Sequence, residues 1–506
     1  MKHFTFSVNG FTIDVDGLVM YHDTYNRAAA ETILTDYLKG LLVFDDLYGS
    51  YIIRINIGKT ETVFADNSGM RRFFIDREQN RIACTFDSLI KDGKKPNYPA
   101  IAQFLHFECI YTNETILEGV YLNDPDAYYK IQDGVIQEFP KGLKEFAAIQ
   151  PDEKALEKVM SLYSKAINDW KHRFCTITGG TDSRAVLSHL LYNRVKPELD
   201  ITGSRSHIDV QIAQQIASMT GLDLHIITDE PEKDWIDDAI GAAAKGCTGV
   251  CGNYRLYKKA KYLGETGDVI ECGGFAGETF KNSFINQDTP FYFGRPDWDR
   301  FLRYKVVTFR FPEELCGENT VPYMHEVMHT MREWAARFTD KKKHRAYIYA
   351  GYRVLQQRNS GICILNSSYY DIYSPLLERN VAAYAFHKSP YSLVMQSYQR
   401  RQVEDHYPAL RDVHTDRGLT CNIHKVLPEM IRSLIYGMKI YLVRTFNRAE
   451  GNFTRVDASF EEGLKSERYA MAIRKCQELG IIKRDVQIEK IPVAVADRLL
   501  ILGSIL

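Results

Sequence analysis

The fold of this chain is decided by residues 173–184, which read RFCTITGGTDSR. Residues 174–178 are short, apolar and β-branched, which predicts a buried strand. Gly179 and Gly180 follow as a tight turn without side chains. Asp182 and Ser183 stand where a helix should begin, and apolar residues between positions 185 and 191 give that helix a buried face. The stretch therefore predicts a strand, a turn and a helix in that order.

This arrangement is suited to binding an anion. Glycines let backbone N–H groups approach a phosphate closely, and the helix dipole favours negative charge at that end. Thr178, Thr181 and Ser183 add hydroxyl donors. Asp182 would repel a bare phosphate, so we expect it to hold Mg²⁺ against one. The Gly-Lys-Ser/Thr of the Walker loop is absent, and the alternative is an ordinary turn between strand and helix.

The stretch resembles the pyrophosphate loop Ser-Gly-Gly-x-Asp-Ser of the ATP pyrophosphatases, with Thr178 in the first position. Enzymes of that family split ATP between the α and β phosphates and leave AMP on a substrate. The resemblance implies that ATP and Mg²⁺ are the cofactors and that residues 178–183 bind ATP. It also implies that Asp182 is a metal ligand.

Composition excludes some classes of function. A chain of 506 residues predicts two or three domains. The formal net charge of −1 gives no electrostatic reason to expect nucleic acid or an anionic membrane as partner. The sequence lacks a long apolar run and a signal peptide, so we expect a cytoplasmic protein without a membrane span. Cys247 and Cys251 match no common zinc spacing, which favours reduced thiols.

Residues 1–145 are predicted to be rich in β-strands, with two helices at 25–38 and 99–107. Residues 44–51, 65–74 and 115–122 resemble, in order, segments of the glutaminase-like domain of asparagine synthetases. The resemblance implies an αββα domain of the N-terminal nucleophile (Ntn) hydrolase type.

The nucleophile of that domain is an N-terminal Cys beside a free α-amine, which serves as the base. Here Lys2 stands at the corresponding position, and the first cysteine is Cys84. We therefore expect this domain to be inactive as a glutaminase. A missing N-terminal Cys is characteristic of the β-lactam synthetases and lasso-peptide cyclases of the superfamily.

Residues 150–425 are interpreted as the synthetase domain, after a linker around 140–155. Pro151 is expected to open a helix whose apolar residues continue to Trp170. Strands at 199–202 and 222–227 flank a helix at 209–220, which Gly221 closes. This succession predicts a doubly wound parallel sheet with ligands beyond the carboxyl ends of its strands, as in a HUP-like ATP pyrophosphatase. Residues 426–506 are predicted to be a helical extension whose basic amphipathic face packs on the core or lies on a membrane.

A second glycine-rich segment, residues 269–278, is expected to complete the site. It resembles the family's Ser-Gly-Glu-Gly-Ala-Asp-Glu, and Gly273, Ala276 and Glu278 match in register. The family's metal-binding Asp is Gly277 here, and its first Glu is Gly274. Asp182 thus loses its expected partner carboxylate. Glu278 is predicted to bind the metal or to orient or deprotonate an amine, unless it only caps a helix.

The remaining candidates follow from the resemblance. Ser204 is expected to contact adenine, although it also fits a plain polar strand end, and Asp209 is expected to be mainly structural. Residues 398–401 and 407–413 resemble the family's C-terminal phosphate-contacting region. The family has a Lys there, and the nearest cations here are Arg400 and Arg401. They are predicted to stabilise pyrophosphate, with a solvated charge run as the alternative.

Together these features predict an asparagine synthetase-like ligase that forms AMP and makes an amide bond. It would adenylate a substrate carboxylate, release pyrophosphate and couple the product to an amine that its own glutaminase site does not supply. A lasso-peptide or β-lactam-type cyclase is a specific case. The alternatives are a degenerate scaffold that binds nucleotide without catalysis, and a tRNA-thiolating enzyme, which would need the basic charge and cysteine pair that this chain lacks.

Overall fold

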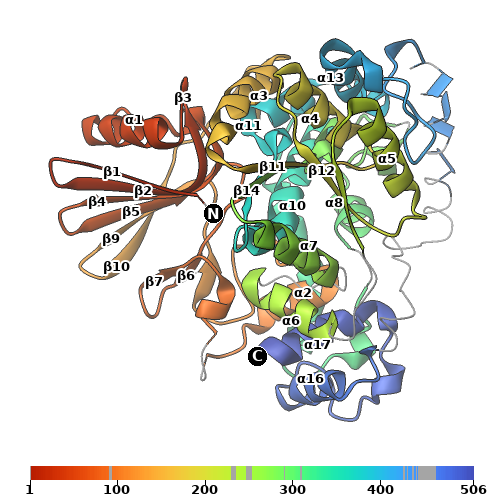
Figure 1. Ribbon diagram of the computed structural model, residues 1–506. Helices are drawn as coiled ribbons and strands as arrows, with labels where there is room; N and C mark the ends of the chain where they lie inside the picture. Colours follow the sequence, from red (N-terminus) through yellow and green to blue (C-terminus); the bar gives the residue numbers. More distant parts are fainter. Residues whose placement is uncertain are drawn as a thin grey trace.

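The computed structural model describes most of the chain (Figure 1). The residues described are 2–90, 94–228, 235–246, 253–289, 291–307, 310–425, 428–429, 431–432, 434–435, 438–439, 442 and 463–506. Cys247 and Cys251 lie outside them. None of the described helices has the length and apolar character needed to cross a bilayer.

The N-terminal region contains two antiparallel sheets. The larger has the order β1-β2-β4-β5-β9-β10, with β3 paired to β2. Its strands are β1 (His3–Val8), β2 (Phe11–Tyr21), β3 (Thr24–Tyr25), β4 (Leu47–Ile57), β5 (Thr60–Ala65), β9 (Ala127–Gln132) and β10 (Val135–Pro140). The smaller sheet is β7 (Arg81–Ala83), β6 (Phe74–Asp76) and β8 (Val120–Leu122).

Helix α1 (Asn26–Lys39) covers one face of the larger sheet, as Figure 1 shows, and its Ile33 and Leu34 share a core with that sheet. Helix α2 (Tyr98–Phe107) lies near the smaller sheet. The two expected helices and the β-rich character are confirmed, whereas the 11-residue β2 was not predicted. The αββα arrangement remains a prediction.

A five-stranded parallel sheet forms the centre of the second region. Its order is β13 (Leu224–Ile227), β12 (Glu198–Thr202), β11 (His172–Thr176), β14 (Val269–Cys272) and β15 (Asp371–Tyr373). Every neighbouring pair is parallel. The chain proceeds from β11 outward in one direction to β13, then returns to β14 on the other side of β11. The parallel α/β sheet is thus confirmed, and the point where the strand order reverses lies between β11 and β14.

Most of the remaining helices lie around this sheet, and the last two lie away from it at the C-terminal end of the chain (Figure 1). They are α3 (Ala155–Ala166), α4 (Thr181–Tyr192), α5 (Ile208–Thr220), α6 (Trp235–Gly246), α7 (Asn253–Thr266), α8 (Trp298–Phe301), α9 (Val321–Ala336), α10 (Lys343–Asn366), α11 (Arg379–His387), α12 (Pro390–Val394), α13 (Ser397–His406), α16 (Glu467–Glu478) and α17 (Val493–Ile505). Gly221 closes α5 with a left-handed φ of 66°, as predicted.

Two expectations about this region need correction. The helix expected from Pro151 begins at Ala155, because Asp152 accepts a hydrogen bond from the Lys154 N–H and holds a turn there. The C-terminal extension packs on the core only in part: Leu434 does so. Four apolar residues in the described part of residues 428–442 are 47% or more exposed: Ile431, Ile435, Met438 and Leu442.

The two regions are joined at the edge of the parallel sheet. Asp371 of β15 accepts hydrogen bonds from the Lys2 backbone N–H and the Trp170 indole, both at 2.8 Å, and pairs with Arg71. The Gly49 N–H donates to the buried carboxyl of Glu378 at 2.8 Å. These contacts hold the start of the chain against the sheet that carries the candidate site.

Candidate functional site

The loops that follow β11 and β14 meet at the reversal point of the parallel sheet. They approach so closely that neither Gly274 nor Gly277 leaves room for a side chain. A Cβ at Gly274 would lie 2.7 Å from the Ser183 backbone nitrogen, and one at Gly277 would lie 2.0 Å from Cγ of Asp182. A side chain at either position would require one of the two loops to move.

The first loop is held by its own hydroxyls. The Thr178 N–H donates to Oγ of Ser183 at 3.1 Å, and the Gly180 N–H donates to Oγ1 of Thr178 at 3.2 Å. Helix α4 begins at Thr181 after Gly180, and no side chain caps it. The first-turn N–H groups of α4 are thus left without a capping side chain at the sheet edge, which is the arrangement that binds anions.

Asp209 is more directly involved in this loop than expected. Its Oδ1 accepts a hydrogen bond from the Gly179 N–H at 3.0 Å. A Cβ at Gly179 would lie 2.4 Å from the same oxygen, so only glycine permits this approach. Arg184, which is fully buried, donates to the carbonyl oxygens of Gly179 at 3.1 Å and His414 at 2.7 Å. The segment around residue 414 is therefore tied to the loop, close to the region expected to contact phosphate.

Asp182 is engaged on both of its carboxylate oxygens. Lys281 lies 2.6 Å from Oδ2, and the Gln399 amide donates to Oδ1 at 3.0 Å. Gln399 also donates to the carbonyl oxygen of Gly277 at 3.2 Å, and so links both loops to α13. No cluster of three His, Cys, Asp or Glu side chains suited to a metal occurs among the described residues. A resident Mg²⁺ would have to displace Lys281 from Asp182, so these residues do not fit a resident ion as they stand.

Glu278 lies in a short 3₁₀ turn, Gly277–Phe280, whose N-cap is Ala276. Glu278 thus stands in the first turn of this helix, and its side chain makes no capping hydrogen bond. Its side chain is exposed, yet its pKa is raised, first by desolvation from the protein around it and then by the charge of Asp182. Lys281 and Arg358 act in the opposite direction. A raised pKa makes this carboxylate a stronger base than an ordinary glutamate.

Arg400 and Arg401 are engaged with other partners. Arg400 is buried and donates to the carbonyl oxygens of Met395 and Asn422 and, at 2.5 Å, to Glu429. Arg401 pairs with Glu153 at 2.6 Å on the surface. The cation that pairs with the loop carboxylate Asp182 is Lys281.

The two other predicted contacts lie on neighbouring strand ends. Ser204 follows β12, and its Oγ contacts Oγ of Ser206 at 3.1 Å. Gly273 follows β14, and its N–H donates to the carbonyl oxygen of Tyr373 at 3.0 Å. Gly273 thus has a role in the sheet, whereas Ser204 sits on the edge where an adenine would be expected.

No family model matches the chain, and no curated protein matches it.

Proposed function

We propose that this protein is an ATP-dependent ligase that forms an amide bond through an acyl-adenylate. The observation that carries this proposal is the uncapped N-terminus of α4 after Gly179 and Gly180, at the reversal point of a parallel sheet. Ligands of such sheets bind at that point, and a helix N-terminus with a side-chain-free turn suits a phosphate chain.

The proposed reaction has two steps. An oxygen of the substrate carboxylate attacks the α-phosphorus of ATP, and pyrophosphate leaves with the electron pair of the broken P–O bond. An amine then attacks the acyl carbon, AMP leaves, and a proton passes from the amine to a base. Loop N–H groups and the Lys281 ammonium would hold the pyrophosphate, and Glu278 is the candidate base.

In this proposal Mg²⁺ arrives bound to the phosphates of ATP, because that ion readily keeps phosphate and water ligands. Asp182 remains the candidate protein ligand once Lys281 turns to the phosphates. The amine is proposed to be free ammonia, a separate molecule or a group on the substrate itself. In the last case the enzyme would be a cyclase of the lasso-peptide or β-lactam type. The cytoplasm is the proposed location.

A scaffold that binds nucleotide without turnover is the second candidate. The glycines at positions 274 and 277 favour it, because two carboxylates expected from the family are missing.

Trapping with hydroxylamine separates the two candidates. Incubation with MgATP, a panel of carboxylic acids and hydroxylamine should give a hydroxamate together with equal amounts of AMP and pyrophosphate. Lys158→Gln is a surface control, because Lys158 pairs with Asp152 on the surface, and it should leave the yield unchanged. Binding of ATP without AMP under all conditions supports the scaffold and contradicts the ligase. Release of ADP and phosphate contradicts both.

A further inference from the structure

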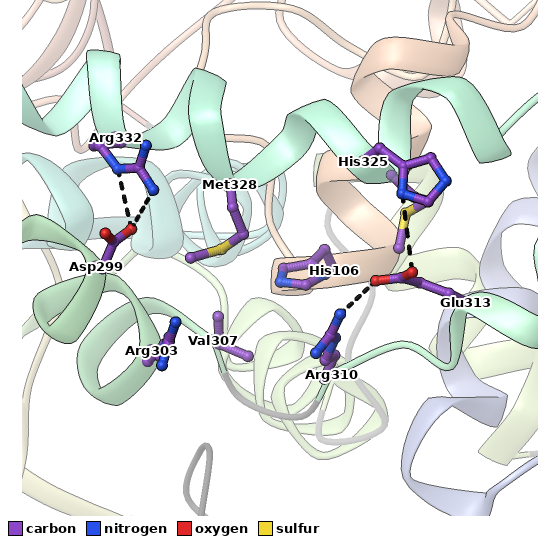
Figure 2. Close-up of a pocket in the computed structure, with 10 residues that line it drawn as sticks. His106, Asp299, Arg303, Val307, Arg310, Glu313, His325, Met328 and Arg332 are labelled. Atoms are coloured by element: carbon purple, nitrogen blue, oxygen red, sulfur yellow. Dashed lines mark hydrogen bonds and ion pairs between the residues drawn. The ribbon is translucent and has the colours of Figure 1, made fainter. Parts of the chain in front are cut away.

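A second cavity, of about 290 Å³, lies among α2, α8, α9 and the segment that follows α8 (Figure 2). Its lining shares no residue with the loops after β11 and β14. Figure 2 shows His106 of α2 between the side chains that descend from α9 and the arginines on the opposite side. The cavity therefore needs an explanation separate from the candidate site.

The cationic side chains of this cavity are unequally neutralised. Arg332 donates two hydrogen bonds to Asp299, at 3.0 and 2.6 Å, and Arg310 pairs with Glu313. Arg303 lines the same cavity and is exposed, and within the described part of the chain its guanidinium makes no ion pair or hydrogen bond. The cavity thus has one guanidinium with its donors free, and a planar guanidinium binds carboxylates through two parallel hydrogen bonds.

His106 is the second unsatisfied group. Its side chain is 5% exposed, and its Nδ1 is buried without a hydrogen-bond partner. Desolvation lowers the pKa of His106 to about 4, helped by the nearby Arg310 and Arg498 and opposed by Glu313, so the ring is neutral at pH 7. A buried polar atom without a partner has lost its hydrogen bond to water and gained none in return. A ligand that offers a hydrogen-bonding atom to this ring would supply the missing hydrogen bond.

Three apolar residues and His325 complete the wall. Met324, Met328 and Val307 line the cavity, and Met324 is buried. His325 lies 3.9 Å from Glu313. Methionine side chains adapt to ligands of irregular shape, and polar groups that converge beside an apolar surface are typical of small-molecule sites. Inorganic phosphate would leave these apolar residues unused.

We propose that this cavity binds a small organic carboxylate with an apolar body. The carboxylate is held by Arg303, the apolar body lies against Met324 and Met328, and His106 hydrogen-bonds a ligand atom. The site is independent of the proposed ligase activity, because it shares no residue with the phosphate loop.

Calorimetry on the full chain tests this site. The probes are hexanoate and benzoate, their uncharged amides, and inorganic phosphate. The acids should bind at least tenfold more tightly than the amides, because a hydrogen bond between two charged groups contributes about 1.5–3 kcal/mol. Arg303→Gln should remove that preference. The control Arg295→Gln alters an exposed arginine outside the cavity lining and should retain it.

A histidine titration by NMR gives an independent readout. Binding of an acid should raise the pKa of His106, since a carboxylate favours the protonated ring, and Arg303→Gln should abolish that rise. The proposal is overturned if no acid binds, if Arg303→Gln binds acids as the wild type does, or if phosphate binds as tightly as the acids. The two readouts use no nucleotide, so failure of the ligase would leave them unaffected.

Discussion

Lys281 and Asp182 form an ion pair at 2.6 Å that joins the two loops of the candidate site. Both side chains are largely buried, and Gln399 holds the other carboxylate oxygen. The ammonium thus stands where a metal would meet the loop carboxylate. On binding of a phosphate chain, we expect this cation to turn toward it.

Lys281→Met should weaken ATP binding by about tenfold or more. The substitution keeps the length of the side chain and removes the charge that offsets Asp182, so the carboxylate then repels the phosphates. Titration calorimetry with ATP, with and without Mg²⁺, measures the effect, which should be larger without Mg²⁺. Lys261→Met is the matched control, because Lys261 pairs with Asp238 at 2.8 Å elsewhere. Equal affinities in all three proteins would show that Lys281 has no role at the phosphates.

The variant Glu278→Gln distinguishes two roles for Glu278: general base for the amine, or contact to the metal or phosphates. If Glu278 accepts the proton of the amine, amide formation should fall by roughly a hundredfold, the usual scale for loss of a general base. Exchange of labelled pyrophosphate into ATP should then persist. Loss of exchange together with product would assign Glu278 to the metal or phosphates. Unchanged rates in both assays would remove it from the site.

Glu378→Gln should stabilise the protein at alkaline pH. Burial between the two regions raises the pKa of Glu378 to about 8 from its usual 4.5, so the folded protein keeps this carboxyl neutral. The neutral Glu378 carboxyl stabilises the fold fully below pH 4.5. This stabilisation declines as pH rises, because the carboxyl ionises first in the unfolded chain, and it is lost above about pH 8.

Glutamine reproduces the neutral acid and can still accept the hydrogen bonds from Gly49 and Tyr373. The free energy of unfolding of Glu378→Gln should therefore equal that of the wild type at pH 4 and exceed it most above pH 8. Each unit of pKa difference is worth about 1.4 kcal/mol. Denaturant unfolding at both pH values measures it. A gain that does not change with pH would contradict the raised pKa.

Lys259→Met should destabilise the fold by about 3–5 kcal/mol. Lys259 lies between two buried carboxylates of the parallel sheet, 2.6 Å from Asp200 and 2.8 Å from Glu271. Removing the ammonium leaves both without a counter-charge in a dry environment. Urea unfolding measures the loss, with the exposed pair variant Lys261→Met as control. A loss below 1 kcal/mol would show that the two carboxyls share a proton instead.

Local patterns made the scaffold predictable. The conformation of the Gly-Gly turn, the closing Gly221 and the apolar strands depends on residues within a few positions. Each lies within about two residues of its predicted place: β11, for example, was predicted at 174–178 and lies at 172–176. β2 was missed although residues 11–16 alternate between apolar and polar, because Gly17 and the apolar run after it break that alternation. Its identity as a strand depends on pairing with both β1 and β4.

The contacts within the site were not predictable in the same way. Lys281 and Gln399 reach Asp182 from 99 and 217 positions away in the sequence, and nothing near either residue signals a partner. The resemblance to a phosphate-contacting region predicted a role for Arg400 and Arg401. In the structure Arg400 pairs with Glu429, and Arg401 pairs with Glu153. The role of Gly277 becomes clear only when the Asp182 carboxyl is seen to fill the space of its missing side chain.

The most direct test of the central proposal is carboxylate-dependent exchange of labelled pyrophosphate into ATP, measured on the wild type and on Asp182→Asn. We expect exchange with at least one acid of the panel in the wild type. We expect none in the variant, whose circular dichroism and melting temperature should match the wild type. Exchange at the wild-type rate in Asp182→Asn, or ATP binding without exchange for every acid, would contradict the proposed adenylation at this loop.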